Sequence, residues 1–367
     1  MGDKEVKTNP YDYAYATGRV RALETKLMTQ AQTSRLFESK TIDDATRVLL
    51  DSGYIITDSI EACVQNNLIE SYDVMSSIIP NPEYLDALLL LHDYHNIKVI
   101  IKSFIHYSPS RKTVSLSKEE EKEIGSENDV TFFFESNENN VLFKDIIHIM
   151  AFPSKVDPAK LFETIRDQRI NELDESFRFT IKRALQEYIH TSDSGVIDTV
   201  VDQQYFKILH EIAETMKNPF FKSYCDFRAD SVNLEILLRI RALKASAAQM
   251  SRSLVQGGSV SKEKIEELYN ASNDEIIAAF ANTSCKRLAE FSSEYGSGVT
   301  TAQFGKTSDN LLIELIRKAK TILFGPEIII AFLVAKEIQV KNINIVLTCL
   351  RNQIPMSLAR EMMRETY

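Results

Sequence analysis

The sequence has no long apolar run, no excess of positive charge and few cysteines, and each shortage excludes a class of protein. The longest apolar run, Ile328 to Ala335, is far shorter than the roughly 20 residues that cross a bilayer. The net charge is −9, with no compensating basic stripe. Because binding to phosphate backbones depends on clustered Lys and Arg, we expect no nucleic-acid partner. Because no apolar run is long enough to cross a bilayer, we expect no direct transmembrane segment.

Cysteine is scarce and scattered. The four cysteines, Cys63, Cys225, Cys285 and Cys349, occur singly and form no CxxC pair. This pattern is typical of reduced thiols inside the cell rather than of a disulfide framework or a zinc site. The polar start, Met1 to Pro10, also lacks the zones of a signal peptide, so we expect a chain that is soluble or lies on a membrane only through partners.

What the sequence does have is one stretch that recurs three times. Each copy has a proline, an acidic residue 11 positions later (93−82, 230−219 and 337−326), and then an asparagine followed by apolar residues. The three copies are Pro82, Asp93 and Asn96; Pro219, Asp230 and Asn233; and Pro326, Glu337 and Asn342. The third copy has two extra residues before its asparagine. Spacing of this kind indicates internal repetition.

The recurring stretch predicts a helix that starts at each proline. Proline is preorganised for the first helical position, and the Asn or Gly before it can serve as an N-cap. We expect the acid and the asparagine to form a junction between this helix and a second, more deeply buried one. A buried asparagine needs hydrogen-bond partners, which favours a structural role over a catalytic one.

The rest of the chain predicts an all-α fold, because apolar residues recur near every 3.6 positions and most of the nine prolines fall at helix starts.

We divide the chain into helical repeats 1–123, 124–248 and 249–367. The segment from Ser108 to Asn140, which is rich in Glu from Ser117 to Asp129, is the main candidate linker, and Val130 to Phe134 within it could form a short ordered or strand-like piece. Asp202 and Asp309 each lie 17 residues before a proline (219−202 and 326−309), as expected of equivalent N-caps; the first repeat has Gln65 there.

No stretch predicts catalytic chemistry, a cofactor or a metal site. Gly305-Lys306-Thr307 resembles the end of a phosphate-binding loop, but Thr300 stands where that loop needs a glycine. His92 and His95 share a helical face, yet they lack a convincing third metal ligand and have no counterparts in the other copies. We therefore expect no enzyme active site.

Several separated motifs resemble a known family. They are the opening Tyr11 to Arg21, the string His92 to Lys98, the set Asp202, Tyr205-Phe206, Asp230 and Asn233-Leu234, and the ending from Phe324-Gly325-Pro326-Glu327 through Lys336-Glu337 to Asn342-Ile343. Together they are similar to the C subunit of the prokaryotic V/A-type ATPase or ATP synthase, the counterpart of the d subunit of the eukaryotic V-ATPase. The resemblance covers essentially the whole chain. Gln65 and the two extra residues before Asn342 are departures from exact repetition.

The resemblance implies a funnel of three similar helical subdomains around a pseudo-threefold axis. It also implies a non-catalytic, peripheral rotor subunit at the cytoplasmic face of a membrane. The partners implied are the D and F subunits of the central stalk and the membrane proteolipid (c/K) ring, and the function is to transmit torque for ATP-coupled proton or sodium ion transport. Two alternatives remain from the residues alone: a helical-repeat scaffold that binds a partner helix, and a helical hydrolase. Periods of 137 and 107 residues (219−82 and 326−219) are much longer than those of common helical scaffolds.

Overall fold

The computed structural model describes residues 9–106, 141–296 and 298–367. Within these ranges all regular secondary structure is helical, apart from an isolated bridge between Tyr295 and Val299. The predicted all-α class is therefore confirmed. The predicted linker Ser108–Asn140, including the strand-like Val130–Phe134, lies outside the described residues. None of the described helices is long and apolar enough to cross a membrane.

The chain forms two compact units. Unit 1 contains Met1–Leu85 and His210–Tyr367, and unit 2 contains Asp86–Leu209. Two long helices, α5 (Glu83–His106) and α10 (Gly195–Met216), continue from one unit into the other. The division into repeats 1–123, 124–248 and 249–367 stays a prediction.

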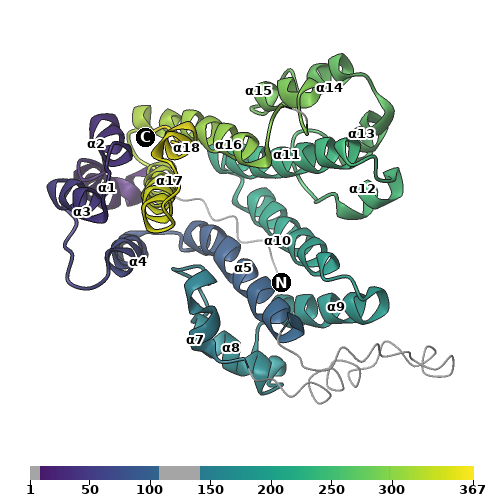
Figure 1. Ribbon diagram of the computed structural model, residues 1–367, viewed down its shortest axis with the longest axis horizontal. Helices are drawn as coiled ribbons and strands as arrows, with labels where there is room; N and C mark the ends of the chain where they lie inside the picture. Colours follow the sequence, from purple (N-terminus) through teal and green to yellow (C-terminus); the bar gives the residue numbers. More distant parts are fainter. Residues whose placement is uncertain (1–8, 107–140, 297) are drawn as a thin grey trace. The chain divides into compact units, whose positions relative to one another are not determined.

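Figure 1 labels most of the helices of the two units. Unit 2 also contains α7 (Phe143–Ile146), η3 (Ile147–Ile149), α8 (Pro158–Arg166), η4 (Ile170–Glu172) and α9 (Glu175–Thr191), where η marks a 3-10 helix. Unit 1 also contains η1 (Pro10–Tyr13), α1 (Ala14–Glu24), α2 (Gln30–Phe37), α3 (Ile42–Asp51), α4 (Ile60–Ile78), α11 (Pro219–Ala242), α12 (Ala247–Ser253), α13 (Lys262–Glu267), η5 (Leu268–Asn270), α14 (Asn273–Ala279), α15 (Lys286–Ala289), η6 (Glu290–Ser293), α16 (Thr301–Ile316), η7 (Arg317–Thr321), α17 (Pro326–Arg351) and α18 (Met356–Glu361).

The three prolines of the recurring stretch stand at the starts of three long helices, called the proline helices below. α11 begins at Pro219 and α17 at Pro326, as predicted, whereas α5 begins at Glu83, one residue after Pro82. The predicted break between two helices is wrong, because each proline helix runs without interruption past its acid and its asparagine. Both side chains bond outside their own helix, so the helical backbone bonds are left intact.

The predicted N-caps Asp202 and Asp309 are also wrong. Asp202 lies inside α10, which begins at Gly195, and Asp309 lies inside α16, which begins at Thr301. The cap of α16 is Thr300, whose side chain accepts the backbone N–H of Gln303 while the Gln303 side chain accepts that of Thr300. This reciprocal pair is a capping box, a stronger start signal than an isolated aspartate.

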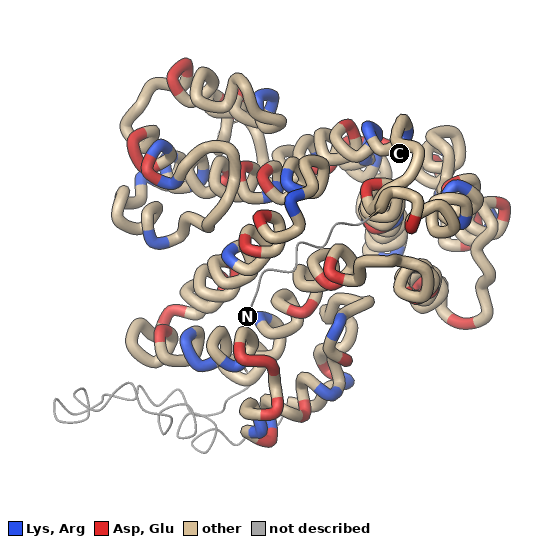
Figure 2. Tube along the Cα trace, turned by 180° about the vertical axis from the view of Figure 1, so that it is seen from behind, with Lys and Arg blue, Asp and Glu red and all other residues tan. Residues whose placement is uncertain are grey.

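The helix α17 forms the core of unit 1. Residues 328–336 are all buried, so more than two full turns are covered on every side. α17 packs against α4, α1, α16 and α3, which surround it in Figure 1. Figure 2 shows acidic and basic residues interspersed along the other described helices, as expected for faces in contact with water.

The starts of the three proline helices are tied together by contacts within unit 1. The ring of Tyr84, at the start of α5, meets that of Phe221, at the start of α11, edge to face at 5.2 Å between centroids. Asn218, the N-cap of α11, donates its side-chain N–H to Glu327 of α17 over 2.7 Å. An aromatic contact and a hydrogen bond to a carboxylate thus hold neighbouring helix starts in place.

Gly325 supports this junction by its backbone conformation. Its φ is 156° and its ψ 170°, a region that only glycine adopts at low cost. A Cβ at this position would stand 2.0 Å from an Oε atom of Glu327. We expect Gly325→Ala to lower the free energy of unfolding by about 1–3 kcal/mol.

Chemical denaturation measures this change, and Gly305→Ala is its matched control. Gly305 lies inside α16 with nothing within 4 Å of an added Cβ. The control should raise stability by about 0.5–1 kcal/mol, because alanine loses less backbone entropy in a helix. Equal effects of the two substitutions would contradict the role given to Gly325.

Candidate functional site: an asparagine clamp on each proline helix

The asparagine of each proline helix binds one distant residue through both of that residue's backbone groups. Asn96 donates to the carbonyl of Ala151 over 3.0 Å and accepts its N–H over 2.7 Å. Asn233 does the same with Val255, at 3.1 and 2.8 Å. Asn342 does the same with Arg364, at 3.1 and 2.9 Å. We call this two-way arrangement the asparagine clamp.

The clamp explains why asparagine occupies these positions. A carboxamide carries a donor and an acceptor side by side, so it can pair with the C=O and the N–H of one residue. The three asparagines are at most 2 % exposed, and without these partners their polar groups would be buried unpaired. Ala151 and Val255 lie in the connections that follow η3 and α12, and Arg364 lies in the irregular segment that follows α18. Each clamp therefore fastens an irregular segment to the side of a buried helix.

The acid of the recurring stretch fastens the same connection a second time in two copies. Asp93 accepts the backbone N–H of Val156 over 3.0 Å, and Asp230 accepts that of Val260 over 3.1 Å. Both partners lie five residues beyond the clamped residue (156−151 and 260−255). The third acid differs, because Glu337 accepts the hydroxyl of Tyr72 on α4.

Asp93 and Asp230 titrate far from their usual range. Burial raises the pKa of each carboxyl group to about 6, although the backbone N–H groups that they accept act in the opposite direction. One oxygen of Asp93 is buried without a hydrogen-bond partner. The ionised form of Asp93 is therefore held in the fold at a cost.

This cost predicts that unit 2 gains stability as the pH falls. The folded pKa of Asp93 is about 6 and its ordinary value is 3.8, so between these values the folded state binds more protons than the unfolded state. The stabilisation is present below the lower value and is lost as the pH rises through 6. We expect Asp93→Asn, which keeps an acceptor for Val156, to flatten this dependence and to stabilise the protein at pH 8 by up to about 3 kcal/mol.

Urea unfolding at pH 5 and pH 8 measures the difference, with Asp73→Asn as the control. Asp73 is an exposed aspartate on α4, and its substitution should leave the pH dependence of the wild type intact. The same pH dependence in wild type and Asp93→Asn would contradict the assignment.

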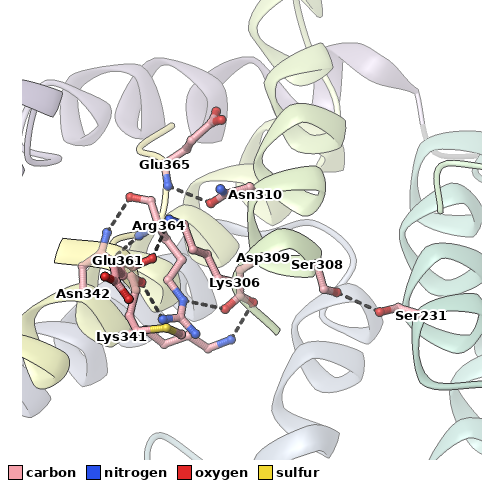
Figure 3. Close-up of polar contacts among 11 residues, drawn as sticks. Ser231, Lys306, Ser308, Asp309, Asn310, Lys341, Asn342, Glu361, Arg364 and Glu365 are labelled. Atoms are coloured by element: carbon pink, nitrogen blue, oxygen red, sulfur yellow. Dashed lines mark hydrogen bonds and ion pairs between the residues drawn. The ribbon is translucent and has the colours of Figure 1, made fainter. Parts of the chain in front are cut away.

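The third clamp is reinforced by an ion network. Figure 3 shows Arg364 between Asn342 and Asp309, with the side chain of Lys341 reaching Asp309 next to that of Arg364. Lys341 donates to one carboxylate oxygen of Asp309 over 2.8 Å, and Arg364 donates to the other over 3.1 Å. Burial raises the pKa of Asp309, but the two cations outweigh it and hold the pKa below its usual value. The carboxylate thus bridges α16, α17 and the clamped segment.

Asp202 has a related role in unit 2. It forms an ion pair with Lys98 over 2.7 Å, two residues after the clamp asparagine of α5. Asp309 and Asp202 therefore both link the middle of one helix to a lysine of a proline helix. Their common spacing from a proline marks ion pairs rather than helix caps.

The other candidate groups bind the chain's own backbone. His92 contacts the carbonyl of Pro153, and His95 contacts that of Ile149 over 3.0 Å. Lys306 lies with Gly305 and Thr307 inside α16 and donates to the carbonyl of Glu361 over 2.6 Å. In the part of the chain that the structure describes, no three His, Cys, Asp or Glu residues gather as metal ligands. The four cysteines are free and buried.

These contacts define an all-α protein whose recurring polar residues clamp its own connections to its longest helices. Comparison with known proteins makes the assignment specific. The chain belongs to the ATP synthase (C/AC39) subunit family, whose model matches residues 16–362. The family predicted from the sequence motifs is thereby confirmed, and the chain is a non-catalytic subunit of an ATP synthase complex.

Individual relatives align with this chain over most of their lengths. The C subunit of the A-type ATP synthase of Methanocaldococcus jannaschii is 24 % identical, over 91 % of this chain and 82 % of that protein. The corresponding A-type C subunit of Methanothermobacter thermautotrophicus is 25 % identical, over 96 % and 88 %. The C subunit of the V-type sodium ATPase of Enterococcus hirae is 20 % identical, over 95 % and 97 %.

Proposed function

We propose that this chain is a central-rotor subunit of an A/V-type ATPase or ATP synthase. In this role it links the central stalk, built from the D and F subunits, to the membrane proteolipid ring, and it transmits torque for ATP-coupled proton or sodium ion transport. Its place is peripheral, at the cytoplasmic face of the membrane.

The observation that carries the proposal is the family match over residues 16–362. Relatives named as subunits of both A-type synthases and a V-type sodium ATPase align over most of their lengths, so the likeness is not confined to one segment. The proposal includes three similar subdomains, 1–123, 124–248 and 249–367, arranged as a funnel around a pseudo-threefold axis. Partners would bind at its two ends.

The clamps are consistent with a mechanical role. A connection that carries torque must not yield locally, and segments with few buried contacts open first. Each clamp removes one such weak point, because it fastens an irregular connection to a buried helix through two backbone groups. The ion pairs of Asp202 and Asp309 add further links between helices.

Affinity purification of a tagged chain from its native cells tests the proposal. Subunits of the stalk and the proteolipid ring should be recovered together with the chain after mild detergent extraction. A tagged helical protein of similar size serves as the control for non-specific recovery. Recovery of soluble partners without any ATP synthase subunit would favour the scaffold alternative.

A further inference from the structure

One surface of unit 1 exposes large apolar side chains next to basic ones. Tyr11 is 72 % exposed, Tyr15 69 %, Leu323 79 % and Phe324 37 %. Exposed apolar clusters rimmed by polar residues mark sites of interaction with proteins or membranes. We call these four residues, together with the exposed Lys318 and Lys320, the Tyr11–Phe324 patch.

The patch is fixed to the fold from two sides. The rings of Tyr11 and Phe324 lie 5.9 Å apart, which joins η1 to the segment that precedes α17. Arg21 of α1 donates to three carbonyls of that same segment, those of Ala319, Lys320 and Ile322, over 3.0–3.3 Å. Tyr13, between Tyr11 and Tyr15, is buried and donates its hydroxyl to Asn81 over 2.8 Å. The exposed side chains therefore stand on a rigid base.

The charge of the patch indicates an anionic partner. The segment 317–324, Arg-Lys-Ala-Lys-Thr-Ile-Leu-Phe, has three basic residues and no acidic one, in a chain of net charge −9. Arg317 forms an ion pair with Glu365 over 2.9 Å, so Lys318 and Lys320 supply the positive charge of the patch. Lys320 lies 4.4 Å from the ring centroid of Tyr367, and Lys318 forms no ion pair with any residue that the structure describes. Asp12 is the one exposed acid on the adjoining η1.

We propose that the Tyr11–Phe324 patch binds the headgroup region of an anionic lipid surface. Tyrosine is enriched at the level of lipid headgroups, where its ring is buried and its hydroxyl remains wet. Basic side chains near it gain from the negative surface potential. Lysine, in contrast, is depleted at protein–protein interfaces, which makes a lipid the better match than a protein. This proposal goes beyond the rotor function, because it requires no partner subunit.

Co-sedimentation of the purified full chain with vesicles tests it. We expect binding to vesicles of phosphatidylcholine mixed with phosphatidylglycerol, little binding to phosphatidylcholine alone, and a decrease with added salt. The double variant Leu323→Ser/Phe324→Ser should reduce the vesicle-bound fraction about tenfold or more. Lys318→Glu should reduce it about tenfold.

Matched variants elsewhere on the chain separate the patch from general effects. Leu243→Ser changes another exposed leucine, 70 % exposed, and Lys286→Glu reverses the charge of another exposed lysine. Both should bind vesicles as the wild type does, and circular dichroism should show that every variant is folded. No binding of the wild type to the anionic vesicles, or equal loss in patch and control variants, would overturn the proposal. Loss of co-purifying subunits in the patch variants, without vesicle binding of the wild type, would assign the patch to a protein instead.

Discussion

Replacing the clamp asparagine Asn233 by leucine should strongly destabilise unit 1. The change removes both hydrogen bonds to Val255, which are the most fully buried of the three clamps. The N–H and C=O of Val255, itself 1 % exposed, would remain buried without partners. Since each unpaired group costs about 1–3 kcal/mol, we expect the free energy of unfolding to fall by about 2–5 kcal/mol. Denaturant unfolding followed by circular dichroism measures this loss.

The chain offers a matched control in Asn344→Leu. Asn344 lies within the proline helix α17, is exposed, and has no side-chain hydrogen bond to another described residue. The same chemical change there should alter stability by less than about 0.5 kcal/mol. If Asn233→Leu lowered the free energy of unfolding no more than Asn344→Leu does, the clamp would contribute nothing to stability.

The Asn233→Leu variant also distinguishes a structural clamp from a binding residue. If Asn233 holds the connection at Val255, its loss should lower stability first and binding of partner subunits only as a consequence. A stability equal to that of the wild type, combined with loss of stalk subunits in affinity purification, would instead indicate that Asn233 touches a partner.

The sequence predicted the positions of the clamps but not their partners. The acid 11 residues after each proline and the asparagine that follows it identified Asn96, Asn233 and Asn342. The cost of burying asparagine pointed to a structural role, which stays a prediction until such variants are measured. The clamped residues Ala151, Val255 and Arg364 are 22 to 55 positions away in the chain. Only their backbone takes part, so no side chain in their sequences could indicate the pairing.

The two wrong predictions share a physical cause. We expected the acid and asparagine to interrupt a helix, and Asp202 and Asp309 to begin one, because these residue types favour caps and junctions. In the fold, their side chains find partners on other segments, which leaves them free to occupy helix interiors. Tertiary contacts of this kind are not visible in local sequence. The capping box at Thr300 was visible as the pair Thr300 and Gln303, and it would have placed the start of α16 correctly.

The largest functional effect is expected from removing the chain from its complex. If the protein links stalk to ring, the head and stalk should still hydrolyse ATP without it, because the proposed role of the chain is not catalytic. Rotation would no longer reach the membrane, so hydrolysis would proceed without ion movement. Coupling should fail completely rather than in proportion to a binding constant, since torque would have no second path to the ring.

The most direct test measures ATP hydrolysis and ion transport together in reconstituted vesicles, with the chain present, absent and added back. If the chain couples stalk to ring, hydrolysis should occur in all three preparations, but transport only when the chain is present or restored. Full transport in vesicles that lack the chain would contradict the coupling function, and loss of hydrolysis in the detached head would indicate a catalytic or directly regulatory role instead.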